Sequence, residues 1–104
     1  MPRRLPQPNA ESFDLTQVLS ALGDPVRLEI LRLVAQSEEP VECSSITLEV
    51  AVAPSTVSHH FKVLREAGLT TTVVDGRRRQ VALRMADVNG RFPGLLAAVL
   101  GAVG

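Results

Sequence analysis

The sequence has few aromatic residues, one cysteine and no net charge. It contains no tryptophan or tyrosine and only three phenylalanines in 104 residues, which excludes modules that bind single-stranded nucleic acid by stacking several bases on aromatic rings. Lysine and arginine together number 11, and so do aspartate and glutamate. The total charge of zero therefore gives no indication of a polyanionic partner.

The single cysteine and the shortness of the apolar runs indicate the compartment. Cys43 cannot form an internal disulfide, and no apolar run of signal-peptide length follows Arg3 and Arg4, so a reducing environment is expected. The longest uncharged apolar stretch, 92–104, has 13 residues, whereas a membrane-spanning helix needs about 20. We therefore expect a cytoplasmic protein that makes no contact with a membrane.

The residues that are present predict one folded domain after a short arm. Hydrophobic residues make up 45% of the chain and charged residues 21%, a composition too apolar for a disordered protein. The length is close to that of a common single domain. Residues 1–12 contain three prolines and no helical periodicity, so they are predicted to form a flexible arm ahead of a domain at 13–104.

Apolar spacing and capping residues predict four helices in the first two thirds of the chain. A short helix starts near Leu15 and ends at Gly23, where a glycine can close it. The second starts at Asp24, a good N-cap, followed by Pro25 at the first helical position. A third runs from 44 or 45 to about 50, and the fourth occupies 54–67.

Helix 54–67 has the clearest separation into two faces. At 100° per residue, Phe61 and Leu64 fall close to Val57 and form an apolar face. The opposite face collects polar side chains, namely Ser55, Ser58, His59, Lys62 and Glu66, with Arg65 at its edge. His60 leans toward the apolar flank, and we interpret it as a structural or edge residue more readily than as a ligand of DNA.

After this helix the pattern changes to extended structure. Residues 70–74 are β-branched throughout, and Asp75-Gly76 is a strong hairpin-turn signal. The segment 70–84 is therefore predicted to be a β-hairpin, followed by one terminal helix. The predicted fold class is mainly α with a β-hairpin, an α+β protein with the element order ααααββα.

The charges are unevenly distributed along the chain. Residues 1–54 carry four basic and eight acidic side chains, whereas 55–104 carry seven basic and three acidic ones. Three of the basic residues, Arg77, Arg78 and Arg79, directly follow the predicted turn. A charge run can serve solubility alone, but beside a helix with a polar outward face it favours binding to duplex DNA, with the helix in the major groove.

Two segments resemble a known family. Residues 19–31, LSALGDPVRLEIL, resemble the opening signature of ArsR-type winged helix-turn-helix repressors, and 54–69, PSTVSHHFKVLREAGL, resemble their recognition helix. The resemblance extends from about residue 13 to the end, with the hairpin as the wing. It implies a homodimeric transcriptional repressor that reads a palindromic operator on double-stranded DNA through helix 54–67 and wing 70–84.

The resemblance also implies roles for individual residues. Those in groove-facing positions, expected to read bases, are Ser55, Thr56, Ser58 and His59. Those expected to bind phosphates are Lys62, Arg65, Arg77, Arg78 and Arg79. The first and last helices are expected to form the dimer interface through Leu15, Val18, Phe92, Leu95, Leu96, Val99 and Val103. Pro54 stands where the family commonly has a polar residue, often glutamine. The departure puts in doubt the base contact that such a residue would make.

Metal sensing, which many relatives perform, is not expected. A thiolate site needs two or three cysteines and the chain has Cys43 alone, while beyond Met85 only Asp87 could serve as a ligand. His59 and His60 point about 100° apart on a helix and cannot chelate one ion. No metal and no cofactor are therefore expected.

Three alternatives accompany this interpretation. A winged helix can act as a protein–protein interaction module, with the basic patch binding an acidic partner. Cys43 can serve as a thiol-redox switch of the repressor, although a small hydrophobic residue is the favoured interpretation, and a small-molecule effector is left open. Arg27 can pair with Asp24 one turn away and need not touch DNA. An enzyme is not expected, because no paired carboxylates, Cys-His pair or glycine-rich phosphate loop stands at catalytic spacing.

Overall fold

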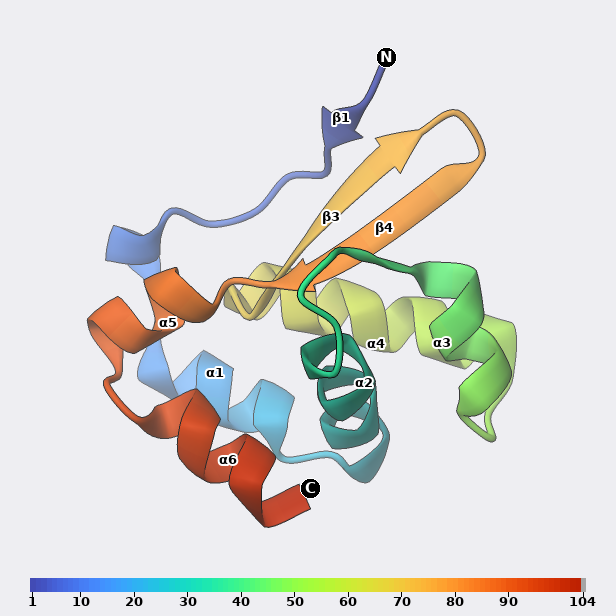
Figure 1. Ribbon diagram of the computed structural model, residues 1–104. Helices are drawn as coiled ribbons and strands as arrows, with labels where there is room; N and C mark the ends of the chain where they lie inside the picture. Colours follow the sequence, from blue (N-terminus) through green and yellow to red (C-terminus); the bar gives the residue numbers. More distant parts are fainter. Residues whose placement is uncertain (104) are drawn as a thin grey trace.

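The computed structural model describes residues 1–103 and has six helices and four strands in that part of the chain (Figure 1). The elements follow in the order β1 (Arg3–Arg4), the 3-10 turn η1 (Ala10–Ser12), α1 (Leu15–Leu22), α2 (Pro25–Ala35), β2 (Val41–Glu42), α3 (Cys43–Glu49), α4 (Pro54–Ala67), β3 (Thr70–Asp75), β4 (Arg78–Leu83), α5 (Met85–Arg91) and α6 (Leu95–Val103). The predicted class, mainly α with a β-hairpin wing, is confirmed. No helix of residues 1–103 has the length and apolar character to cross a membrane.

The predicted start of α2 is confirmed in detail. The side chain of Asp24 accepts hydrogen bonds from the amides of Val26, at 2.8 Å, and Arg27, at 3.0 Å, and Pro25 occupies the first turn. The bond from the Arg27 amide is the main cause that lowers the pKa of the Asp24 carboxyl below its ordinary value. A capped N-terminus fixes the direction in which α2 leaves α1.

The hairpin is part of a four-stranded antiparallel sheet with the order β1-β3-β4-β2. Asp75 pairs with Arg78, so the two central turn residues are Gly76 and Arg77, one position later than predicted. Gly76 has φ +62°, and no non-glycine residue among 1–103 has a positive φ. A turn with positive φ only at its first central residue suits this glycine, whereas a turn centred on Asp75-Gly76 would need positive φ at both.

Residues 1–12, expected to be a flexible arm, contact the sheet edge near their start and α5 near their end. Strand β1 pairs with the edge of β3, and the amide of Leu5 donates to the carbonyl of Thr72 at 2.9 Å. Further along, the guanidinium of Arg84 donates to the carbonyl of Pro8 at 2.7 Å. Main-chain bonds at a sheet edge need no apolar pattern in the sequence, so periodicity could not reveal this pairing.

The single terminal helix predicted from the sequence is wrong, because two helices occupy this region. Helices α5 and α6 are separated at Pro93 and Gly94, and Gly94 has φ +83°. Proline disfavours a helical conformation in the residue before it, and positive φ ends a regular helix. Helix α5 escaped prediction because Asn89 and Gly90 are weak helix formers and its apolar spacing is poor.

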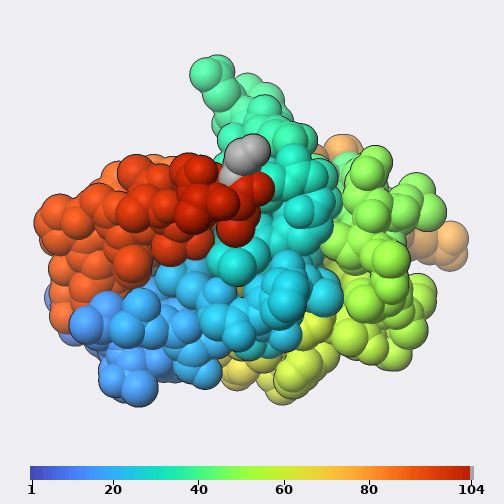
Figure 2. Space-filling model, turned by 90° about the horizontal axis from the view of Figure 1, so that it is seen from below, coloured from blue at the N-terminus to red at the C-terminus, as the bar shows by residue number. Residues whose placement is uncertain are grey.

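Helices α1 and α6 lie side by side on one face of the protomer (Figures 1 and 2). The apolar side chains of α1 lie in two environments, because Leu15 and Leu19 are 47% and 49% exposed whereas Val18 is buried. Leu96 of α6 is likewise fully buried. Val18 and Leu96, both expected at the dimer interface, therefore belong to the core of the protomer, and this part of the prediction is corrected.

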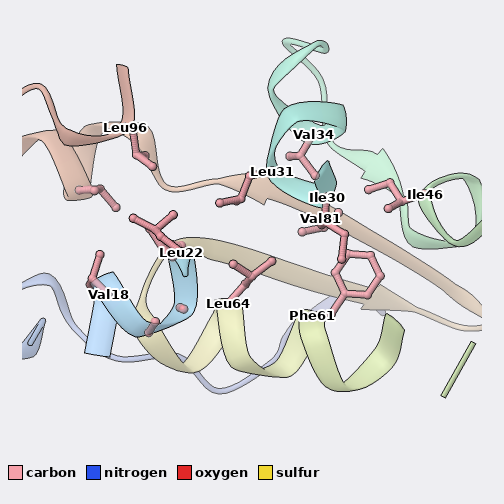
Figure 3. Packing of buried hydrophobic residues seen from close by; sticks show 14 of the residues in the cluster. Val18, Leu22, Ile30, Leu31, Val34, Ile46, Phe61, Leu64, Val81 and Leu96 are labelled. Carbon is pink, nitrogen blue, oxygen red and sulfur yellow. The ribbon is translucent and has the colours of Figure 1, made fainter. Parts of the chain in front are cut away.

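The core lies between α4, α2 and the sheet. Phe61 and Leu64 of α4 point toward Ile30 and Leu31 of α2, beside Val81 of β4 (Figure 3). Ile30, Leu31, Leu64 and Val81 have no exposed surface. Burying one such side chain contributes about 1.5–3 kcal/mol, so the inner face of α4 is firmly held and its outer face has a fixed orientation.

Candidate nucleic-acid interface

Helix α4 presents its predicted polar face to solvent. Val57, Phe61 and Leu64 are buried. The outward residues are exposed, and they are Ser55, Thr56, Ser58, His59 and Lys62. The helix begins at Pro54 after Ala53, which provides no side-chain cap, so the first-turn amides have no side-chain acceptor there. Such a helix end has donors and a positive dipole oriented for an anion.

The other end of α4 is held by Gly68 and Phe13. Gly68 has φ +93°, and its amide donates to the Arg65 carbonyl while the Leu69 amide donates to that of Leu64, both at 3.0 Å. The Phe13 ring covers Gly68 so closely that a Cβ at this position would lie 2.2 Å from the ring. The close approach requires a glycine here and fixes the direction in which the chain enters β3.

His60 and Arg27 connect three helices inside the protomer. His60 is 8% exposed, and its Nδ1 lies 3.0 Å from Nη1 of Arg27. Arg27 also donates from Nε to the Ala21 carbonyl, at 2.6 Å, and from Nη2 to the Ser20 carbonyl, at 3.2 Å. Since a guanidinium can only donate, Nδ1 of His60 is the acceptor. The structural interpretation of His60 is confirmed, and Arg27 contacts α1 and α4 with its side chain.

Arg27→Met is expected to lower the free energy of unfolding by about 2–3 kcal/mol, because it leaves the buried His60 nitrogen and the Ala21 carbonyl without their donor. Arg32→Met on the same helix is the control, since Arg32 forms a surface ion pair with Glu29, and exposed pairs of this kind add little. Urea denaturation followed by circular dichroism measures both changes. Equal losses in the two variants would contradict the role assigned to Arg27.

The wing separates the three arginines that the sequence places together. In β4, Arg79 is opposite Val74 and lies on the same face as buried Val81, so it faces the helices. Arg78 lies on the other face, where its Nη2 is 2.6 Å from Oε1 of Glu42. Arg77 is at the turn. The alternation of a strand assigns neighbours to opposite faces, so these arginines cannot all contact one ligand in the same way.

A pocket of about 250 Å³ opens between α3, α4 and the wing. Among the residues that line it are Cys43, Ser58, Lys62, Arg65, Thr72 and Arg79. Among residues 1–103, no carboxylate forms an ion pair with its three cations. In the same part of the chain, Nε of Arg65 and the buried hydroxyl of Thr72 have no hydrogen-bond partner. The pocket therefore combines positive charge with unused polar groups, which suits a phosphate oxygen.

Cys43 lies in this pocket with a protonated thiol. Burial raises the pKa of the thiol to about 11, although Arg79 acts in the opposite direction. The thiolate is the reactive form, so at neutral pH the redox-switch alternative is disfavoured. Within the part of the chain that the structure describes, no three His, Cys, Asp or Glu side chains group as metal ligands would.

Comparisons with known proteins identify the family. Residues 22–73 match the family model of a helix-turn-helix domain. An uncharacterized HTH-type transcriptional regulator of Bacillus subtilis, YceK, is 39% identical over 77% of this chain and 80% of its own. A putative arsenical resistance operon repressor of Halobacterium salinarum, ArsR2, is 38% identical over 68% of this chain and 59% of its own. The chain belongs to the ArsR-type helix-turn-helix family.

A solved structure supports the winged form of this ArsR-type regulator. The homodimeric winged helix-turn-helix DNA-binding domain of Mb0332 from Mycobacterium bovis, a possible ArsR-family regulator, has a TM-score of 0.66 and 27% identity, covering 82% of this chain and 76% of that one. The chain is thus a transcriptional regulator with a DNA-binding winged helix rather than an enzyme. Its family match covers α2, α3 and α4.

Sequence reasoning on this ArsR-type chain missed two residues that lie beside the wing. Glu42, which binds Arg78, comes from a strand of two residues that is too short to show alternation. Arg3 lies on β1, whose pairing leaves no side-chain signal. A basic residue in a short segment that precedes the domain is the only sequence signal that could have drawn attention to Arg3.

Proposed function

We propose that this protein is a homodimeric repressor that acts in the cytoplasm and reads a palindromic operator on double-stranded DNA. The observation that carries the proposal is the exposed polar face of α4. B-DNA has a major groove about 12 Å wide, which admits one helix. Ser55, Thr56, Ser58 and His59 would read base edges from this face, while the wing follows the adjoining phosphates.

The phosphate contacts are proposed for the cations that have no carboxylate partner among residues 1–103. Lys62, Arg65 and Arg79 converge on the pocket between α4 and the wing, and Arg77 lies at the exposed turn. Arg78 contributes less, because Glu42 neutralises it and it faces away from α4. Direct binding to phosphate releases counterions from DNA, so affinity should fall steeply with salt.

The dimer is proposed to form through α1 and α6. Leu15 and Leu19 are about half exposed, and the two helices share one face of the protomer (Figure 2). Phe92, Leu95 and Val99 of this region are only partly buried. An exposed apolar face of this kind supports association with a second copy, and the Mycobacterium bovis relative is a homodimer.

Leu19→Glu is expected to convert the dimer to a folded monomer, because a charge would be buried at the interface without a partner. Leu48→Glu on α3 is the control, since Leu48 is 89% exposed and lies away from α1 and α6. Sedimentation equilibrium measures the mass of each variant, and circular dichroism checks its fold. A dimer that survives Leu19→Glu would place the interface elsewhere.

Selection of bound duplexes from random and genomic fragments tests the proposed function. The expected product is an inverted repeat whose half-sites lie about one helical turn apart, because a two-fold dimer places two recognition helices in successive major grooves. Ser58→Ala and His59→Ala should change the selected bases, whereas Lys62→Gln should weaken binding to all sequences. Recovery of no preferred duplex by the dimer would refute the proposal.

A further inference from the structure

Strand β1 extends the hairpin of the wing at the outer edge of β3. Arg3 pairs with Val74 and Arg4 with Val73, both close to the turn of the hairpin (Figure 1). Both arginines are exposed. The pairing with β3 continues just beyond the strand, where the Leu5 amide donates to the Thr72 carbonyl at 2.9 Å. Two cations from the start of the chain are thereby brought beside the tip of the wing.

The register determines which of these two arginines faces the recognition helix. Residues directly opposite each other in neighbouring antiparallel strands share a face. Arg3 is opposite Val74, which is opposite Arg79. These three therefore lie in one row on the face that bears the pocket with α4. Arg4 falls in the next row, on the opposite face of the sheet.

Arg3 is an unpaired cation in this row. Among residues 1–103, neither Arg3 nor Arg79 forms an ion pair with a carboxylate. Arg3 and Arg79 lie on one face with strand β3 between them, about 10 Å apart across the sheet, and two like charges there repel each other unless an anion lies nearby. A duplex whose backbone passes over Arg79 would present its next phosphates to Arg3.

We infer that β1 is part of the DNA interface and that Arg3 binds a backbone phosphate next to the one bound by Arg79. The inference rests on the proposed function and extends it to a segment outside the helix-turn-helix. Because β1 is paired to β3 before DNA arrives, little of its conformational entropy remains to be lost on binding. The contact adds affinity without base preference, since phosphates carry no sequence information.

Arg3→Gln and Arg4→Gln form a matched pair, because they remove the same charge from opposite faces of one strand. Fluorescence anisotropy with the selected operator, at several salt concentrations, measures affinity and its salt dependence. Arg3→Gln should weaken binding about tenfold and reduce the slope of log K against log salt by about two, one contact from each protomer. Arg4→Gln should change both values much less. Equal effects of the two substitutions, or no effect of Arg3→Gln, would overturn the inference.

The same assay separates this inference from the proposed function. If Arg77→Gln and Arg79→Gln weaken binding while Arg3→Gln does not, the wing binds DNA and only the role of β1 is refuted. If the unsubstituted dimer binds no duplex, both are refuted. Thermal unfolding checks that each variant is folded, and the exposure of Arg3 and Arg4 means that neither substitution should change the transition.

Discussion

Gly68→Ala is expected to lower the free energy of unfolding by about 3 kcal/mol. The backbone of Gly68 has φ +93°, a conformation that costs a residue with a side chain about 1–2 kcal/mol. The added methyl group would also lie 2.2 Å from Cε1 of Phe13, so the ring must move within a packed core at a further cost of about 1–3 kcal/mol. Chemical denaturation of the purified protein measures the sum.

Gly76→Ala at the wing turn is the matched control. Gly76 has φ +62°, but a Cβ there meets nothing within 4 Å, so only the backbone term of about 1 kcal/mol is expected. The difference between the two variants isolates the contact with Phe13. Phe13→Leu should reduce the cost of Gly68→Ala, because the two sites share one contact. A Gly68→Ala variant no less stable than Gly76→Ala would show that the ring relaxes freely.

The elements that were predictable from the sequence are those with local boundary signals. Asp24 and Pro25 start α2 as predicted. Helix α4 ends at Gly68 because positive φ is open to glycine. The two faces of α4 were also predictable, since Val57 and Phe61 repeat at helical spacing within one element. In each case, residues within one or two turns determine the outcome.

What the sequence could not reveal depends on partners distant in the chain. Leu15 and Val18 were both expected at the dimer interface, but in the structure, where α1 packs on α4 and α2, Val18 is buried while Leu15 stays exposed. Arg78 and Arg79 read as one basic run, and their separation follows from strand register and from Glu42. Composition and periodicity describe one element at a time, so they do not identify which surface covers it.

The link between α1 and α4 has a consequence for the proposed dimer. Arg27 donates to two carbonyls at the end of α1 and to His60 on α4. Helix α1 would lie at the dimer interface, while α4 would lie in the groove. A rigid connection between them sets the distance between the two recognition helices, and this distance must match one turn of DNA. Arg27→Met should therefore weaken operator binding even at temperatures where the variant remains folded.

The double substitution R77Q/R79Q is expected to lower operator affinity about a hundredfold or more. Four phosphate contacts disappear from the dimer, so the slope of log K against log salt should fall by about 3.6. Arg77 is exposed at the turn and Arg79 faces the pocket beside α4. Anisotropy titrations over a range of salt concentrations provide both values. Since phosphates do not specify sequence, the ratio of operator to non-operator affinity should change little.

Comparison of R79Q with R78Q locates this effect on one face of the wing. The two substitutions remove the same charge from adjacent residues, but Arg78 is bound to Glu42 on the face away from α4. R79Q should reduce the salt slope by about two for the dimer, whereas R78Q should reduce it by less than one. If R78Q matched R79Q, long-range charge rather than direct contact would govern binding. DNA would then approach the wing from its tip, because only the tip lies near both faces.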